Sequence, residues 1–497
     1  MTPDPSPHER TSVGRLRERI VLRCPALPVA GLLVIPFIGS TRCTIRLPSP
    51  SSVFARLRSP HDRDILHLAV PALAGLASDP LASLVDTAFV GQLGRIPLAA
   101  LGINASIFSM AFLVFNFLAY GTTPRVGRAV GEGDRTEAGR VVLRAFLLAV
   151  LAGIVALTLL QLLAVPILRL MGASGEVMGP ALTYLRIRAL AGPALLLITA
   201  GNGAFRGYQD TRTPMWITVG FNIVNVTLDP ILIFWAGWGI AGAAAATAIA
   251  QWIGALMFVG LLLGRRREEL GIELEIPSLR SLTPFLTIGR DLFLRTATLV
   301  GTMGLATAVA ARVGVTAVAA HQVANQLWLF LALVVDALAV AGQALVSKHL
   351  GSDDPTTART VANRLLQWGL GVGVALGIGF ALLQPFLPPF FTDDAATIST
   401  VLGIFGFVAW LQPLNGLVFV WDGIYMGTEK FGYLAKAMIA SAAAAATVLV
   451  LVKPMGWGLE GVWWGITTLM GVRLVTLAVP HIRKQLFRDA AEEVVEG

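Results

Sequence analysis

Hydrophobic and polar positions divide the chain after residue 62 into long apolar segments separated by short polar loops. A segment of about 20 apolar residues is long enough to cross a bilayer as a helix. Lipid offers no hydrogen bonds to a bare backbone, so each span is expected to be helical. The pattern predicts helices over 64–91, 97–126, 138–165, 177–201, 212–235, 239–263, 285–312, 316–347, 361–384, 396–421, 431–452 and 458–481.

Composition agrees with a membrane protein, because 55% of the residues are hydrophobic and only 14% are charged. The net charge of +8 could suggest a nucleic-acid partner. However, the basic residues lie in short loops between apolar segments, where they act as topology determinants. We therefore expect a lipid bilayer as the surroundings and no nucleic acid. Most Lys and Arg follow even-numbered helices, which predicts a multi-pass protein of the inner (plasma) membrane with both termini in the cytoplasm.

The two halves of the chain are similar to each other. "LGRIPLAALGINAS" (93–106) aligns with "VGVTAVAAHQVANQ" (313–326) at an offset of 220 residues, and Gly203 and Gly207 align with Gly423 and Gly427. The sequence predicts an all-α membrane protein of twelve transmembrane helices in two pseudo-symmetric six-helix lobes related by a parallel repeat. The predicted parts are an extension (1–62), an N-terminal lobe (63–263), a cytoplasmic linker (264–284), a C-terminal lobe (285–483) and a cytoplasmic tail (484–497).

The extension is rich in Arg, Pro and Ser and holds both cysteines of the chain, Cys24 and Cys43. Its apolar part is short and interrupted by proline, so it is not expected to span a membrane. A targeting peptide is one interpretation. We favour the alternative of a disordered or dispensable tail, with translation starting later, for example near Val53.

A carboxylate is costly in hydrocarbon, so an acid inside a span usually faces a partner or a water-filled cavity. Asp86 and Asp229 lie late in two helices that run outward. Tyr184 and Thr247 lie early in two helices that run inward, and Asn225 precedes Asp229 by one turn. At about 1.5 Å per residue, all five side chains fall in one layer of the N-terminal lobe.

This layer suggests a site for the coupling ion. Burial and a neighbouring carboxylate both favour the protonated form of an acid, so Asp86 and Asp229 are candidates to take up protons from outside. Oxygens of Asp86, Asn225 and Asp229 could instead bind sodium. The alternative is that these side chains only join helices by hydrogen bonds. We prefer this alternative for Asn225 or Thr247 alone, and the ion site for two acids at a common depth.

Other polar residues inside the spans are harder to interpret. Asp336 and Asn116 occupy equivalent positions in the repeat, and either could line a substrate cavity or form a helix-packing contact. Asp79 precedes a proline and is expected to cap a break in the first helix. Arg186 and Arg188 could extend to the membrane surface or pair with a carboxylate, and we expect them to be structural. No ATP-binding GxxxxGK[ST], HExxH or GxSxG motif occurs, so neither an ATP-driven protein nor an enzyme is indicated, and no cofactor is expected.

Several stretches together resemble the multidrug and toxic compound extrusion (MATE) family, most closely its bacterial DinF-like branch. They include "VDTAFVGQLG" (85–94), "YLRIRALAGP" (184–193), "FRGYQDTRTP" (205–214) and "NVTLDP" (225–230), and the resemblance extends over residues 60–485. It implies a cation-coupled antiporter with two lobes that alternate access. The coupling site of the family matches the layer of Asp86, Tyr184, Asn225, Asp229 and Thr247. The helix-7 glutamate of some branches is replaced by Arg295, which argues against a C-terminal cation site like that of those branches.

We therefore predict a monomeric antiporter, driven by protons or sodium, that exports organic small molecules by alternating access. Cationic amphipathic substrates are expected, because an acidic and aromatic cavity suits them. A lipid-linked precursor flippase of the same superfamily is the alternative, but it would need a strongly cationic cavity. An intramembrane enzyme would need paired catalytic groups or a metal site, and neither is visible in the sequence.

Overall fold

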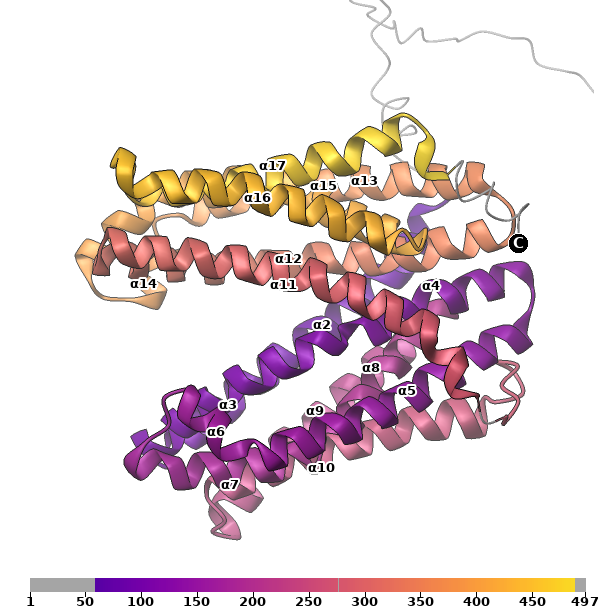
Figure 1. Cartoon of the computed structure of the whole chain (residues 1–497), viewed down its shortest axis with the longest axis horizontal. Coiled ribbons are helices and arrows are strands. Elements are labelled where there is room, and N and C mark those ends of the chain that lie inside the picture. Colours follow the sequence, from indigo (N-terminus) through magenta and orange to yellow (C-terminus); the bar gives the residue numbers. More distant parts are fainter. Residues whose placement is uncertain (1–58, 276, 488–497) are drawn as a thin grey trace, which may run out of the picture. The chain divides into compact units, whose positions relative to one another are not determined.

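The computed structural model describes residues 59–275 and 277–487, so most of the predicted extension and much of the predicted C-terminal tail lie outside it. The described residues are almost entirely helical (Figure 1). The helices of the first half are α2 (Asp62–Gly91), α3 (Arg95–Leu113), α4 (Phe117–Glu132), α5 (Arg135–Leu162), α6 (Ala164–Leu170), α7 (Met178–Ala189), α8 (Gly192–Gly207), α9 (Arg212–Pro230) and α10 (Ile240–Val259). Those of the second half are α11 (Thr283–Val313), α12 (Val315–Gly351), α13 (Pro355–Leu383), α14 (Leu387–Phe391), α15 (Ala395–Gly427), α16 (Phe431–Met455) and α17 (Gly458–Ile482).

The helices are long and apolar enough for a multi-pass membrane protein. Eleven spans in the described chain meet this condition, and a twelfth is formed if a bent pair is taken as one span. The bent pair joins residues 175–189 to α8 at an angle of 48°. The sequence predicted one helix over 177–201 here. Pro193 is the second residue of α8 and has no N–H to continue the hydrogen-bond ladder of α7, which accounts for the break.

Helix packing follows the internal repeat. In the first half α4 and α5 pack against α8, and in the second half α12 and α13 pack against α15 (Figure 1). A side chain at Gly203 would meet the backbone of Ala119, and one at Gly423 would meet the backbone of Ala339. Gly423 follows Gly203 by 220 residues, and Ala339 follows Ala119 by the same number. Two equivalent glycines thus permit the same close approach of helices in the two halves, as the sequence repeat predicts.

Helix α12 joins the two halves, because it packs against α13 and α15 and also against α2 and α4. The Gln343 side chain donates a hydrogen bond of 2.7 Å to the Tyr120 carbonyl oxygen. Gln209, in the loop after α8, donates one of 2.8 Å to the carbonyl oxygen of Ala344. Contact is close here because Gly127 leaves room for the side chain of Ser347.

Helix α15 extends to Gly427, whereas the sequence predicted an end at 421. The difference of a few residues places Asp422 inside a helix, where only 4% of it is exposed. Helix α2 is also continuous through Pro71 and Pro80. The prediction that Asp79 caps a break at this point is therefore wrong, since no break occurs.

Candidate functional site

Asp86 on α2 and Asp229 on α9 face each other. Their carboxyl groups are close enough for a hydrogen bond between them, which requires one of them to carry a proton. Asp229 is fully buried. No donor from the described part of the chain reaches Oδ1 of Asp86 or either oxygen of Asp229. Buried oxygens of this kind are costly without a partner, so this pair can accept a proton or a cation.

The backbone around Asp229 departs from a regular α-helix. Pro230 has no N–H to donate, and the five residues that follow it, Ile231–Trp235, form a π-helical turn. Such turns occur often at functional sites. The turn follows Pro230 directly, so Asp229 lies at the point where the regular α-helix ends.

The other three predicted site residues surround this acid pair from α7, α9 and α10. The Asn225 side chain donates to Oγ1 of Thr247 at 3.4 Å, and Thr247 donates to the Ala243 carbonyl oxygen at 2.9 Å. Tyr184 packs into a small apolar cluster with Val90, Leu101, Ile233, Ala243 and Ala244. The structure thus brings Asp86, Tyr184, Asn225, Asp229 and Thr247 into one neighbourhood with apolar walls.

Arg188 belongs to the same neighbourhood, which the sequence did not predict. Its guanidinium donates a hydrogen bond of 2.7 Å to Oε1 of Gln251 and lies 5.0 Å from the centre of the Phe108 ring. It is also within hydrogen-bonding reach of the Tyr184 hydroxyl. Its charge interacts with Asp86, so Arg188 offsets part of the negative charge of the acid pair.

A second contact between α2 and α9 lies seven residues before the acid pair on each helix. Asn222 donates to Oδ1 of Asp79 at 2.8 Å and to the Ser78 hydroxyl at 2.9 Å. Seven residues are about two helical turns, so this contact and the acid pair lie on the same helix faces. The two helices are therefore joined by two successive polar contacts.

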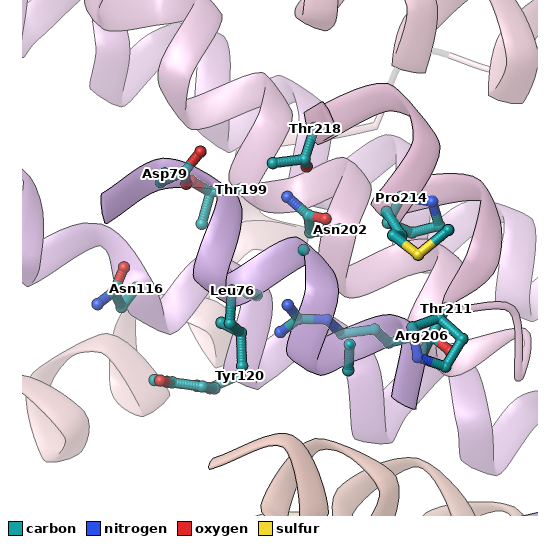
Figure 2. Close-up of a pocket in the computed structure, with 15 residues that line it drawn as sticks. Leu76, Asp79, Asn116, Tyr120, Thr199, Asn202, Arg206, Thr211, Pro214 and Thr218 are labelled. Atoms are coloured by element: carbon teal, nitrogen blue, oxygen red, sulfur yellow. The ribbon is translucent and has the colours of Figure 1, made fainter. Parts of the chain in front are cut away.

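A cavity of about 230 Å³ opens beside the second contact (Figure 2). Its walls come from α2, the turn Val114–Asn116, α4, α8, α9 and the loop before α9. Asn116 lines the cavity, as one sequence interpretation suggested. The polar side chains that line it with Asn116 are Asp79, Tyr120, Thr199, Asn202, Arg206, Thr211 and Thr218.

Asp336, on α12 in the second half of the chain, is not among the residues that line this cavity. It is near a group of buried charges on α11, α15 and α17. Arg295 donates to Oδ2 of Asp422 at 2.6 Å, and Arg473 donates to the same oxygen. The sequence missed Asp422 because its helix was predicted to end at 421, the residue before it, whereas the helix continues to Gly427. The repeat could have revealed it, since Asp422 is equivalent to Asn202 of the cavity.

Outside the spans, hydrogen bonds to the Asp210 carboxylate hold the loop after α8 in place. Asp210 accepts hydrogen bonds from the backbone and side chain of Thr213, at 2.9 and 2.6 Å, and from Arg266 at 3.0 Å. Partial burial favours the neutral acid, but these hydrogen bonds outweigh it and hold the pKa of Asp210 below its usual value of 3.8. The loop is thus anchored to the start of the linker.

Apolar spans, two repeated halves and a polar interior define a multi-pass membrane transporter rather than an enzyme. Comparison with known families identifies which one: the MatE family model matches residues 71–231 and 293–452, and the chain belongs to this family of multidrug and toxin efflux transporters.

Its relatives include the Protein DETOXIFICATION 44, chloroplastic, of Arabidopsis thaliana, which is 36% identical over 83% of this chain and 80% of that protein. The DNA damage-inducible protein F of Escherichia coli (strain K12) is 28% identical over 86% of this chain and 95% of that protein, in agreement with the predicted DinF-like branch. The crystal structure of MATE in the bent conformation has a TM-score of 0.80 at 21% identity, covering 88% of this chain and 98% of that one.

Proposed function

We propose that this protein is a cation-coupled antiporter that exports small organic compounds across the plasma membrane by alternating access. It acts as a single chain with both termini in the cytoplasm. The observation that carries the proposal is the pair of facing carboxyl groups of Asp86 and Asp229, whose buried oxygens have no protein donor among the described residues. Two ionised carboxylates so close together repel each other, so the pair is suited to take up a positive charge.

The coupling ion binds between α2 and α9. The facing arrangement favours a proton held between the two carboxyl groups. Sodium is the alternative, and the oxygens of Asp86, Asn225 and Asp229 are the hard ligands that it would use. No group of three or more acidic, His or Cys side chains suited to a metal occurs in the described chain, so a sodium site would depend on neutral oxygens as well.

Ion and substrate sites share the same two helices. Helix α2 carries Asp86 and also Leu76 and Asp79 of the cavity, and α9 carries Asp229 and Thr218. Neutralising the acid pair removes the repulsion between the helices and changes the cavity wall two turns away. Coupling requires the ion and the substrate to favour different conformations, because binding strength alone shifts no equilibrium. Pro71 and Pro80 are points at which α2 can bend.

The test is transport by the purified full-length protein in liposomes, with an imposed pH or sodium gradient applied separately. Asp86→Asn and Asp229→Asn are expected to abolish gradient-driven transport while leaving the protein folded. Asp353→Asn is the matched control, since Asp353 is exposed in a loop at a positive φ of 52° that Asn tolerates. Full gradient-driven transport by both site variants would overturn the proposal. A sodium gradient that drives transport where a pH gradient does not would identify sodium as the ion.

A further inference from the structure

Arg206 places a positive charge in the wall of the cavity. It lies in the last turn of α8, and its guanidinium extends towards Leu76 (Figure 2). Arg206 makes no hydrogen bond and no ion pair with any residue in the described part of the chain. It therefore meets the cavity with its five N–H donors free.

Three other interior arginines of the described chain each have a side-chain partner. Arg188 donates to Gln251, and Arg295 and Arg473 share Asp422. A charged side chain inside a membrane span is costly and is normally paired. Arg206 differs from these three because its partner is missing, so its position is explained if a ligand supplies the partner.

The surrounding charges leave the interior positive at this point. Arg206 interacts with Tyr120 and Asp336, and Asp336 interacts in turn with Asp422, Arg295 and Arg473. Three arginines thus face two aspartates, with one positive charge in excess. Asp79 also lines the cavity, but it lies apart from Arg206 (Figure 2) and accepts a hydrogen bond from Asn222, so the positive charge is local to the Arg206 end.

The size and lining of the cavity limit the ligand further. Its volume of about 230 Å³ is below the range of about 300–1,000 Å³ for sites of drug-sized molecules. Asn116, Thr199, Asn202 and Thr218 add neutral hydrogen-bonding groups around the guanidinium. A guanidinium matches a carboxylate in a planar, two-point contact. The cavity is therefore suited to a small polar anion more than to a bulky lipophilic cation.

We propose that the transported substrate carries a carboxylate that pairs with Arg206. This inference rests on the proposed function, because it takes the cavity as the substrate site. It replaces the cationic amphipathic substrate expected from the sequence. Asn202 and Tyr120 line the same cavity from α8 and α4 and would orient the rest of the molecule.

Binding to the purified full-length protein in detergent, measured by calorimetry, tests the inference without any ion gradient. Benzoate and phthalate serve as carboxylate probes, and benzyltrimethylammonium serves as a cation of similar size. We expect the carboxylates to bind and Arg206→Gln to weaken them by about 10- to 100-fold, the effect of losing a charged hydrogen bond. Arg206→Lys should restore part of the affinity. Arg212→Gln, which removes an exposed arginine outside the cavity, should leave it unchanged.

The inference fails if only the cation binds, if no probe binds, or if Arg206→Gln binds benzoate as well as the unchanged protein does. The melting temperature without ligand separates binding from folding, because removing an unpaired, partly buried charge should not lower it. Failure of the proposed ion coupling would appear instead in the transport of the Asp86 and Asp229 variants, which this binding measurement does not use.

Discussion

Asp62 at the start of α2 forms a two-point ion pair with Arg364 on α13. Arg364 Nε donates to Oδ1 at 2.6 Å and Nη2 donates to Oδ2 at 2.8 Å, while the Trp368 indole N–H also donates to Oδ1 at 2.9 Å. The pair joins the first helix of one half to a helix of the other half. Less than a fifth of each side chain is exposed, so solvent screens the pair only in part.

We expect this ion pair to stabilise the described conformation. Arg364→Gln and Asp62→Asn should each lower the melting temperature, and the double variant should show a coupling energy of about 1 kcal/mol or more between the two sites. Thermal unfolding of the four proteins in detergent measures this energy. Additive effects of the two substitutions would mean that the pair contributes nothing of its own.

Asp422 is expected to be essential for the stability of the second half. Asp422→Ala leaves Arg295 and Arg473 buried without their shared partner. Removing one member of a buried ion pair typically costs about 3–5 kcal/mol, so the variant should fold poorly or melt at a much lower temperature. Asp393→Ala, at an exposed position before α15, is the control. Equal melting temperatures for the two variants would refute this role.

The close packing at Gly203 predicts that a glycine-to-alanine substitution there lowers stability, whereas the same substitution at Gly220 does not. Gly203→Ala adds a methyl group about 2.8 Å from the backbone of Ala119, whereas Gly220→Ala adds one in open space. Overpacking typically costs about 1–3 kcal/mol, but an alanine in an open helical position gains about 0.5–1 kcal/mol over glycine. Gly203→Ala should thus lower the melting temperature and Gly220→Ala should not. A neutral Gly203→Ala would show that α4 and α8 can separate freely.

The hydrogen bonds of Asp210 predict that the stability of the fold depends on pH. The pKa of Asp210 is lower in the folded protein than its ordinary value of 3.8, so the ionised form stabilises the fold above that pH. This contribution should disappear as the pH falls through the depressed pKa. Asp210→Asn is therefore expected to reduce the melting temperature at pH 7 and to differ less from the unchanged protein at pH 3. A difference that does not depend on pH would show that Asn replaces the hydrogen bonds.

Hydrophobic periodicity was sufficient to predict the spans and the repeat, because a bilayer requires about 20 apolar residues in each crossing. Depth along the helices was sufficient to group Asp86 with Asp229. It could not show which side chains fill the space between helices, so the donor role of Arg188 and the free guanidinium of Arg206 were missed. Helix ends are fixed by local hydrogen bonding that composition does not reveal, which is why Asp422 was placed outside its helix.

The equivalence of Asn202 and Asp422 has a consequence for how new specificities arise. One copy of the repeat holds an uncharged amide at this position, facing open space, whereas the other holds an acid locked between two arginines. In the proposed function, substitutions around Asn202 would change which substrates the cavity accepts, while the ion pairs of Asp422 would stay as they are. Evolution, or an engineer, has to alter only one of the two duplicated units.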